Sequence, residues 1–159
     1  MRAMNAEAPA RILEAAARAG AGRFIQISSG GLLGATGDSP AGEDFLPRPL
    51  SPYERSKWSG EQAVSEAARR LGMPLAVLRP ALVYGPGDSH LTARLRAARG
   101  RFRVLLDGGR ALCHPVHVSD VTECVRLCIV SSTPVEGVYH VAGERPVAWR
   151  EWLDTIAAA

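Results

Sequence analysis

The chain has 159 residues, and its 19 basic and 16 acidic side chains give a net charge of +3. This length suits one domain, since a chain of about 150 residues buries roughly 70% of its unfolded surface. With 47% hydrophobic and 22% charged residues, the composition is that of a folded globular protein and excludes a disordered one. The charge excess is small and dispersed, which argues against a nucleic-acid partner.

Membrane, secretory and metal-binding classes find no support in the sequence. No apolar run approaches the length of a membrane span, and the first residues lack a secretory signal, so we expect a cytoplasmic protein with no membrane partner. Cys113, Cys124 and Cys128 are odd in number and form no CxxC pair, so neither disulfides nor a metal site is indicated. Cys124 and Cys128 stand four apart in an apolar helical pattern and are expected in the core.

The first half of the chain predicts alternating helices and strands. Apolar side chains recur at helical spacing in two segments, and two short apolar runs are typical of buried strands. In chain order we expect a helix, a strand, a proline- and glycine-rich surface loop, a helix and a strand at residues 6–19, 23–27, 34–52, 53–71 and 75–78. Arg79-Pro80 is expected to close the last strand. Strands separated by such a helix indicate a parallel α/β sheet covered on both faces.

The second half is more mixed. It predicts a turn, a polar helix, a strand, a helix, a strand and a final helix at residues 84–88, 89–99, 102–106, 119–130, 138–141 and from 147 onward. Trp149 and Trp152, three residues apart, are expected in the core of this part. His117 is interpreted as a packed strand residue, and Asp120 as a carboxylate near a helix N-terminus that caps free N–H groups.

A glycine pattern, GxxGxxG, covers residues 31–37 directly after the first strand. This spacing can bind a dinucleotide pyrophosphate only where a helix begins at the glycines and directs its N–H groups at the phosphates. Asp38, Ser39 and Pro40 follow instead, with no apolar periodicity. We therefore interpret the segment as a flexible loop.

Ser29, Tyr53 and Lys57 form the strongest candidate site. Tyr53 and Lys57 are four residues apart at the start of a predicted helix, so both side chains project from one face. A nearby ammonium stabilises a phenolate, which allows a tyrosine to act as an acid or base. Ser29 follows the preceding strand, at the edge where open α/β sheets bind ligands. Its hydroxyl is placed to hold a substrate carbonyl or alcohol.

These residues stand within six segments whose order resembles a known family. Asn5 leads an Ala-rich helix, and the other five segments are RFIQISSGGLLG, SPYERSKWSGEQAV, RPALVYGPGD, HPVHVSDV and GVYHVAGE. Together they resemble the carboxyl-terminal portion of an extended short-chain dehydrogenase/reductase, in the NAD-dependent epimerase/dehydratase group. The resemblance covers nearly the whole chain.

The resemblance implies a Rossmann-like α/β fold, the later half of a doubly wound parallel sheet with a small substrate-binding portion. Residues 1–88 would form the later part of the Rossmann-like domain, and 89–159 the substrate-binding portion with a closing strand and helices. It further implies Tyr53 as acid/base, Lys57 as its activator and a ligand of the nicotinamide ribose, and Ser29 with Gly30 as substrate-binding residues. Pro80, Ala81, Leu82 and Val83 would lie near the nicotinamide of NAD or NADP.

Three departures from the family pattern qualify these expectations. The matching region begins after the family's glycine-rich cofactor fingerprint, so the sequence reads as a truncated form. Leu33 replaces a common Tyr, and Cys113 stands where nucleotide-sugar enzymes often carry an Arg that clamps a diphosphate. Arg110 is the nearby residue that could bind the substrate instead.

The expected function is that of an NAD(P)-dependent oxidoreductase or epimerase acting on a hydroxyl or carbonyl carbon of a sugar or other small substrate. The alternative is a non-catalytic binding or interaction module derived from that fold. Because the missing strands would leave a sheet edge open, we also expect a homo-oligomer or a complementing chain.

A basic run follows the turn and is open to two interpretations. It comprises Arg94, Arg96, Arg99, Arg101 and Arg103. These arginines either hold a phosphate or carboxylate of the substrate or form a solvated helix face, and we favour the solvated face. His90, His114 and His140 show no metal-ligand spacing.

Overall fold

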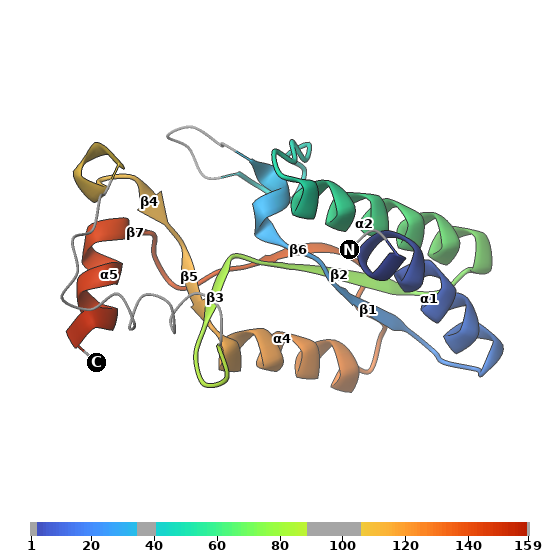
Figure 1. The fold of residues 1–159 in the computed structure, drawn as a ribbon. Coiled ribbons are helices and arrows are strands. Elements are labelled where there is room, and N and C mark those ends of the chain that lie inside the picture. Colours follow the sequence, from blue (N-terminus) through green and yellow to red (C-terminus); the bar gives the residue numbers. More distant parts are fainter. Residues whose placement is uncertain (1–2, 35–40, 89–105, 159) are drawn as a thin grey trace.

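A three-stranded parallel sheet forms the centre of the computed structural model, which describes residues 3–34, 41–88 and 106–158 (Figure 1). Its strands, in spatial order, are β1 (Phe24–Ile27), β2 (Leu75–Pro80) and β6 (Gly137–Val141). The pairing aligns Ile27 with Leu78, and Leu78 with Tyr139. Parallel strands linked through helices confirm the α/β sheet predicted from the sequence.

Two helices cover one face of this sheet. They are α1 (Ala8–Arg18), preceded by a π-helical turn at Ala3–Glu7, and α2 (Pro52–Leu71). Leu13 of α1 and Val64 of α2 are fully buried against each other's helix, and Phe24 and Leu75 of the sheet pack on the same cluster. This layer fixes the orientation of α2, the helix that carries the predicted acid/base pair.

The N-terminus of α2 is strongly specified by its local sequence. Ser51 precedes Pro52, and its hydroxyl accepts a hydrogen bond from the Glu54 N–H while the Glu54 carboxylate accepts one from the Ser51 N–H at 2.8 Å. Such a capping box satisfies two of the free N–H groups at a helix start. These backbone bonds lower the pKa of Glu54 below its usual value. Tyr53 is thereby held in the first turn.

The helix α4 (Val118–Val130) covers the opposite face of the sheet (Figure 1). Cys128 and Val121 pack there on Ala76, Leu78 and Val141, and Cys124 lies beside them, so both cysteines belong to the core as predicted. The guanidinium of Arg23, just before β1, donates to the carbonyls of Cys128 and Ser131 at the end of α4. A cation at this position satisfies carbonyls that a helix end leaves free.

A second part of the structure is built from short strands and one helix. β3 (Leu82–Tyr84) pairs in parallel with β5 (Pro115–His117), and β4 (Leu112–Cys113) pairs antiparallel with β7 (Val147–Ala148). A 3-10 turn at Leu106–Gly109 precedes β4, and α5 (Trp149–Ala158) ends the described chain. Trp149 and Trp152 meet edge to face at 5.4 Å in the core of this part, as predicted.

Several boundaries differ from the sequence prediction. β2 continues through Arg79 and Pro80, and the last helix begins at Trp149 because the two residues before it pair with β4. The N-cap of α4 is His117, whose Nδ1 accepts a hydrogen bond from the Ser119 N–H, and Asp120 lies in the first turn beside Ser119. The expected strands did not include β3, β4 or β7, whereas β5 contains His117, which was predicted to be a strand residue.

Parts of the sequence prediction fall on residues outside the described ranges. The predicted helix at 89–99 lies there, together with His90 and the basic run from Arg94 to Arg103. Of the predicted strand at 102–106, only Leu106 is described, and it begins the 3-10 turn. The glycine pattern at 31–37 is described as far as Gly34, where Gly30–Leu33 form a short 3-10 helix.

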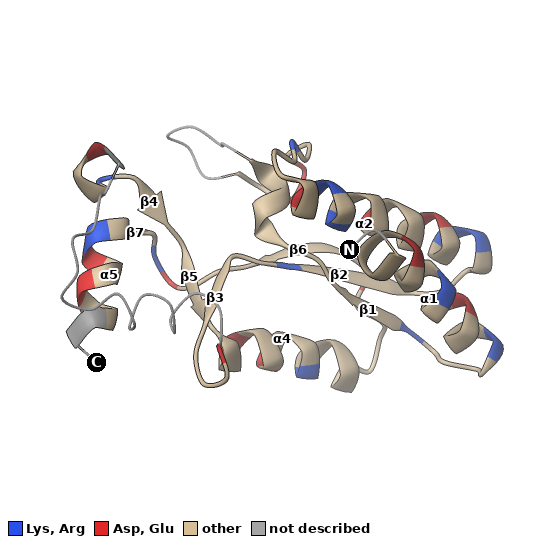
Figure 2. Cartoon of the chain, in the orientation of Figure 1, with Lys and Arg blue, Asp and Glu red and all other residues tan. Residues whose placement is uncertain are grey.

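Acidic and basic residues are both spread along the helices (Figure 2). Ion pairs three residues apart join Arg69 to Glu66 on α2 and Arg126 to Glu123 on α4. Because these side chains are exposed, each pair contributes at most about 1 kcal/mol to stability. None of the helices in the described part of the chain is long and apolar enough to cross a membrane.

Candidate active site

The loop after β1 lies against the end of β2, at the carboxyl edge of the sheet. The Ser28 N–H donates to the Leu78 carbonyl at 2.7 Å and so extends the strand pairing by one residue. A Cβ added to Gly30 would lie 3.1 Å from the Pro80 carbonyl oxygen and 3.2 Å from the Ala81 Cα. The close approach that glycine allows brings Ser29 and Gly30 beside Pro80 and Ala81, four of the predicted site residues.

Ser29 has a structural contact of its own. Its hydroxyl accepts a hydrogen bond from the Gly31 N–H at 3.2 Å and caps the 3-10 helix Gly30–Leu33. The capping geometry holds the side chain at the edge of the sheet. Because a hydroxyl accepts and donates, its O–H remains able to donate to a carbonyl or alcohol oxygen.

Lys57 connects α2 to the same edge. Its ammonium donates to the Ile27 carbonyl, the last of β1, at 2.9 Å. Burial lowers the pKa of Lys57 from its usual value of 10.5, and the negative charge of Glu61 opposes that shift. Tyr53, one turn earlier on α2, is 46% exposed, so the phenol is accessible to a ligand. The structure thus gives the YxxxK pair a shared helix face beside the end of β1.

The Tyr53 backbone is fixed by a relay of polar contacts. The Ser56 hydroxyl donates to the Tyr53 carbonyl at 2.7 Å and accepts a hydrogen bond from the Asn5 side chain at 3.1 Å. Asn5 belongs to the π-helical turn before α1. The segment that resembles the family's Asn-led helix therefore contacts the first turns of α2.

A buried ion pair that the sequence pattern did not predict lies beneath the site. The Glu61 carboxylate accepts hydrogen bonds from the Ser28 hydroxyl at 2.6 Å and from Arg79 through Nε and Nη2. Glu61 and Arg79 side chains are each only 4% exposed. The signal available in the sequence was Glu61 four residues after Lys57 on the same helix face, together with a charged residue directly after a buried apolar run.

The remaining predicted residues lie farther along the chain. Leu82 packs with the core of the second part, and Val83 beside it is 37% exposed. Arg110 forms an exposed ion pair with Asp107 in the turn before β4. In Figure 1 that turn lies at the far left, apart from the start of α2, so the structure does not bring Arg110 to Tyr53.

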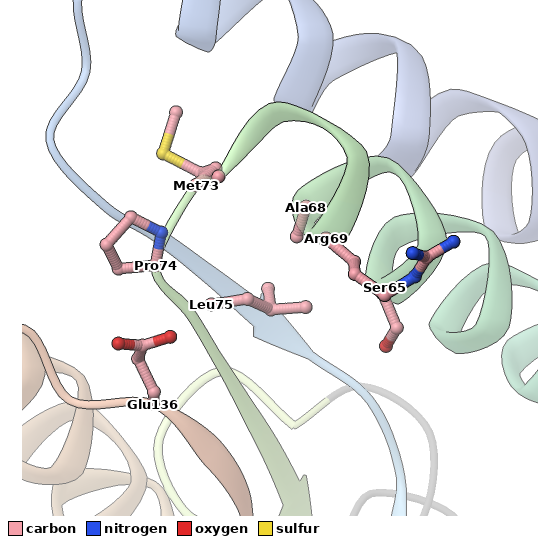
Figure 3. Close-up of a pocket in the computed structure, with 8 residues that line it drawn as sticks. Ser65, Ala68, Arg69, Met73, Pro74, Leu75 and Glu136 are labelled. Atoms are coloured by element: carbon pink, nitrogen blue, oxygen red, sulfur yellow. The ribbon is translucent and has the colours of Figure 1, made fainter.

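A pocket of about 360 Å³ lies elsewhere, at the amino edge of the sheet (Figure 3). It is lined by the end of α2 and the start of β2, including Arg69, Met73 and Leu75, and by Glu136 before β6. Pro74 and Leu75 begin β2, whereas Pro80 ends it, so this pocket and the Tyr53 site lie at opposite edges. The pocket is therefore no part of the candidate site.

Metal chemistry finds no ligand set in the described part of the chain. Among residues 3–34, 41–88 and 106–158, no three His, Cys, Asp or Glu side chains gather as metal ligands would. Burial raises the pKa of the Cys113 thiol, which keeps it protonated and unreactive. The groups that this site offers for chemistry are the hydroxyl of Ser29, the phenol of Tyr53 and the ammonium of Lys57.

The sequence matches the model of a known protein family. The family described as "NAD dependent epimerase/dehydratase family" matches residues 2–142. The chain belongs to this family. The match spans α1, α2, the three strands of the central sheet and α4, so it includes every element around the Tyr53 site.

Two curated family relatives are reductases. The chain is 35% identical to a dTDP-4-dehydrorhamnose reductase of Mycobacterium tuberculosis, over 92% of this chain and 48% of that protein. It is 31% identical to a 2-alkyl-3-oxoalkanoate reductase of Stenotrophomonas maltophilia, over 76% of this chain and 36% of that protein. The chain thus spans about half the length of the first of these relatives and about a third of the second.

A solved structure shares the fold closely. MoeE5, in complex with UDP-glucuronic acid and NAD, superposes with a TM-score of 0.82 and is 30% identical, over 97% of this chain and 53% of that one. The likeness confirms the Rossmann-type fold that the sequence resemblance implied. Nearly all of this chain therefore corresponds to about half of the MoeE5 chain.

Proposed function

We propose that this chain carries the proton-transfer half of an NAD(P)-dependent oxidoreductase or epimerase that acts on a hydroxyl or carbonyl carbon of a sugar-type substrate. The observation that carries the proposal is the position of Lys57, whose ammonium reaches the end of β1 at the Ile27 carbonyl one turn from an accessible Tyr53. Relatives that are sugar-nucleotide reductases or NAD complexes support the substrate class and the cofactor.

The side chains at this edge fit the nicotinamide end of such a cofactor. A lysine ammonium has three N–H donors, and the bond to Ile27 uses one, which leaves two for the hydroxyls of a ribose. Ser29, Pro80 and Ala81 lie together at the carboxyl edge, where open α/β sheets bind nucleotides. When bound there, NAD(P) would supply hydride transfer.

The chain's own residues would move the proton. Tyr53 donates its O–H proton to a carbonyl oxygen during reduction or takes the proton of an alcohol during oxidation. The Lys57 ammonium stabilises the phenolate that forms, because opposite charges favour the ionised group. The Ser29 O–H binds the same substrate oxygen and orients it toward Tyr53. These roles for Ser29, Tyr53 and Lys57 are the ones the sequence predicted.

Replacing Lys57 with methionine tests the cofactor-binding role. We expect the wild-type chain to bind NADH or NADPH at up to millimolar concentration, and Lys57→Met to bind at least about tenfold more weakly, since a hydrogen bond to a charged group contributes about 1.5–3 kcal/mol. Nicotinamide fluorescence and the shift of melting temperature measure both affinities.

Two controls make this experiment specific. Arg69→Met removes a cation from the exposed, far end of α2 and should bind the cofactor like the wild type.

The second control is the stability of the Lys57→Met variant itself. Because burial lowers the Lys57 pKa, the charged ammonium lowers the stability of the wild type at neutral pH, and that stability rises again as the pH rises toward 10.5. Lys57→Met should therefore fold at least as stably as the wild type. Absence of binding by the wild-type chain at millimolar cofactor would contradict the proposal.

A second candidate function is a binding module that pairs through the open edge of β1. Within the described residues, β1 pairs only with β2, and Ile27 on it is 39% exposed. Unpaired strand edges bind strands of other chains. The helix α4 also exposes the apolar side chains of Leu127 and Val130.

Sedimentation velocity tests the pairing. We expect the chain to dimerise at high concentration, and Gln26→Lys in β1 to weaken the dimer by about tenfold, because a charge on an edge strand opposes pairing. Arg126→Lys on α4 keeps its charge and serves as the control. A wild-type chain that stays monomeric at the highest soluble concentration would rule out the binding module.

A further inference from the structure

Glu61 is a buried charge that the proposed reaction does not use. It stands on α2 one turn after Lys57 and two turns after Tyr53, and only 3% of the residue is exposed. A carboxylate is costly to bury unless hydrogen bonds and an opposite charge compensate. The side chains that hydrogen-bond to the Glu61 carboxylate therefore indicate what this buried charge does in the fold.

The partners come from two strands. The Ser28 hydroxyl, at the end of β1, donates to Glu61 Oε2 at 2.6 Å, and Arg79, near the end of β2, donates to both carboxylate oxygens. The paired geometry of guanidinium and carboxylate fixes direction as well as distance. One side chain of α2 thus holds the carboxyl ends of β1 and β2.

Each partner is the chain neighbour of a site residue. Ser28 precedes Ser29, and Arg79 precedes Pro80. The hydrogen bonds from Ser28 and Arg79 to Glu61 thus lie next to the place where the loop at Gly30 packs against Pro80. We propose that Glu61 is a positioning residue, whose carboxylate sets the distance of Ser29 and Pro80 from Tyr53 and Lys57. The inference rests on the proposed function for the roles of those four residues.

Trp58 and Glu43 complete the surroundings of this ion pair. The Arg79 guanidinium lies 6.0 Å from the Trp58 ring centroid, on α2, and Glu43 accepts a hydrogen bond from the His140 N–H on β6, the strand beside β2. The charge of Arg79 and the His140 bond both lower the pKa of Glu43, with the His140 bond the larger cause. The loop that carries Glu43 is therefore held over the same end of the sheet.

Lys57 provides a direct probe of the positioning because it is the only lysine in the sequence. A chain grown with lysine labelled at ¹³Cε gives one lysine resonance, and its pH titration reports the Lys57 ammonium alone. The titratable groups around Lys57 are Tyr53 and Glu61 on α2, while β1 presents the Ile27 carbonyl and β2 presents Arg79. In the wild type we expect a midpoint below 10.5, since burial lowers the Lys57 pKa.

The first test variant is Ser28→Ala, which removes the hydrogen bond from Ser28 to Glu61 and leaves the charges of Glu61 and Arg79 in place. If Glu61 holds the end of β1, this segment moves away from α2, Lys57 becomes more exposed, and its midpoint rises toward 10.5. Ser65→Ala, on an exposed position of the same helix, should leave the midpoint unchanged. An unchanged midpoint in Ser28→Ala would overturn the proposal.

The second test replaces the whole pair in Glu61→Met/Arg79→Met, which should fold because apolar residues can fill a buried ion-pair site at little cost. Hydrogen exchange of the Ser28 N–H, bonded to Leu78, should accelerate at least about tenfold, while amides in the middle of α2 keep their protection. If Glu61 and Arg79 only stabilised the fold, their replacement would change hydrogen exchange throughout the chain or not at all. Either result would contradict a positioning role for Glu61. Both tests run without cofactor, so failure to bind NADH would refute only the proposed function.

Discussion

Gly60→Ala should destabilise the chain by about 3 kcal/mol or more, the upper range for overpacking a core. A Cβ at position 60 would lie 1.8 Å from the Asn5 carbonyl oxygen and 3.0 Å from its carbon. Both are backbone atoms, so no side chain can rotate away. The methyl group would force α2 from the turn before α1, where Asn5 also bonds Ser56.

Urea denaturation measures this loss as a fall in the transition midpoint. Gly22→Ala is the matched control, because a Cβ there meets nothing within 4 Å and the backbone is not left-handed. We expect that control to stay within about 0.5 kcal/mol of the wild type. Equal midpoints for the two variants would show that α2 does not contact the Asn5 backbone as closely as the structure places it.

Gly60 illustrates what the sequence could not reveal. A glycine inside a predicted helix is normally unfavourable, by about 1 kcal/mol relative to alanine. The compensation, close contact with Asn5, joins residues 55 positions apart and exists only in the folded chain. By contrast, the helix start at Pro52 was predictable, since proline at the first helical position and the polar residue before it act locally.

The short strands were equally hidden. β4 and β7 have two residues each, too few to show an alternating pattern, and pair only because the fold brings Cys113 to Val147. The extension of β2 was missed for a different reason. Arg79 and Pro80 are poor strand residues by themselves, yet Glu61 neutralises the buried guanidinium, and Pro80 lies beyond Leu78, where the pairing of β2 with β1 ends.

The residues of the candidate site could be proposed from the sequence, but most of the contacts that hold them in place could not. Tyr53 and Lys57 could be placed on one helix face from their spacing, and the structure adds that Lys57 reaches the end of β1. The cap of α4 was assigned to Asp120, but the helix begins one residue earlier than predicted, and the side chain at the capping position belongs to His117. Local patterns thus predicted the residues of the candidate site, but placed the boundaries of the elements less accurately.

Arg79→Met should cost about 3–5 kcal/mol of stability, because removing one partner leaves a buried charge unpaired. Glu61 would keep only the hydrogen bond from Ser28. Replacing both members with methionine should restore most of the stability, whereas Glu66→Met/Arg69→Met, at the exposed pair of the same helix, should change little in any background.

A double-mutant cycle on urea midpoints separates the two contributions of the buried pair. Additive losses for Arg79→Met and Glu61→Met would mean that the side chains do not interact, contrary to their paired hydrogen bonds. A strongly non-additive cycle, with a double methionine variant about as stable as the wild type, means that the pair contributes little net stability. Its value to the protein then lies in where it holds the ends of β1 and β2, which is the property that the Lys57 titration measures.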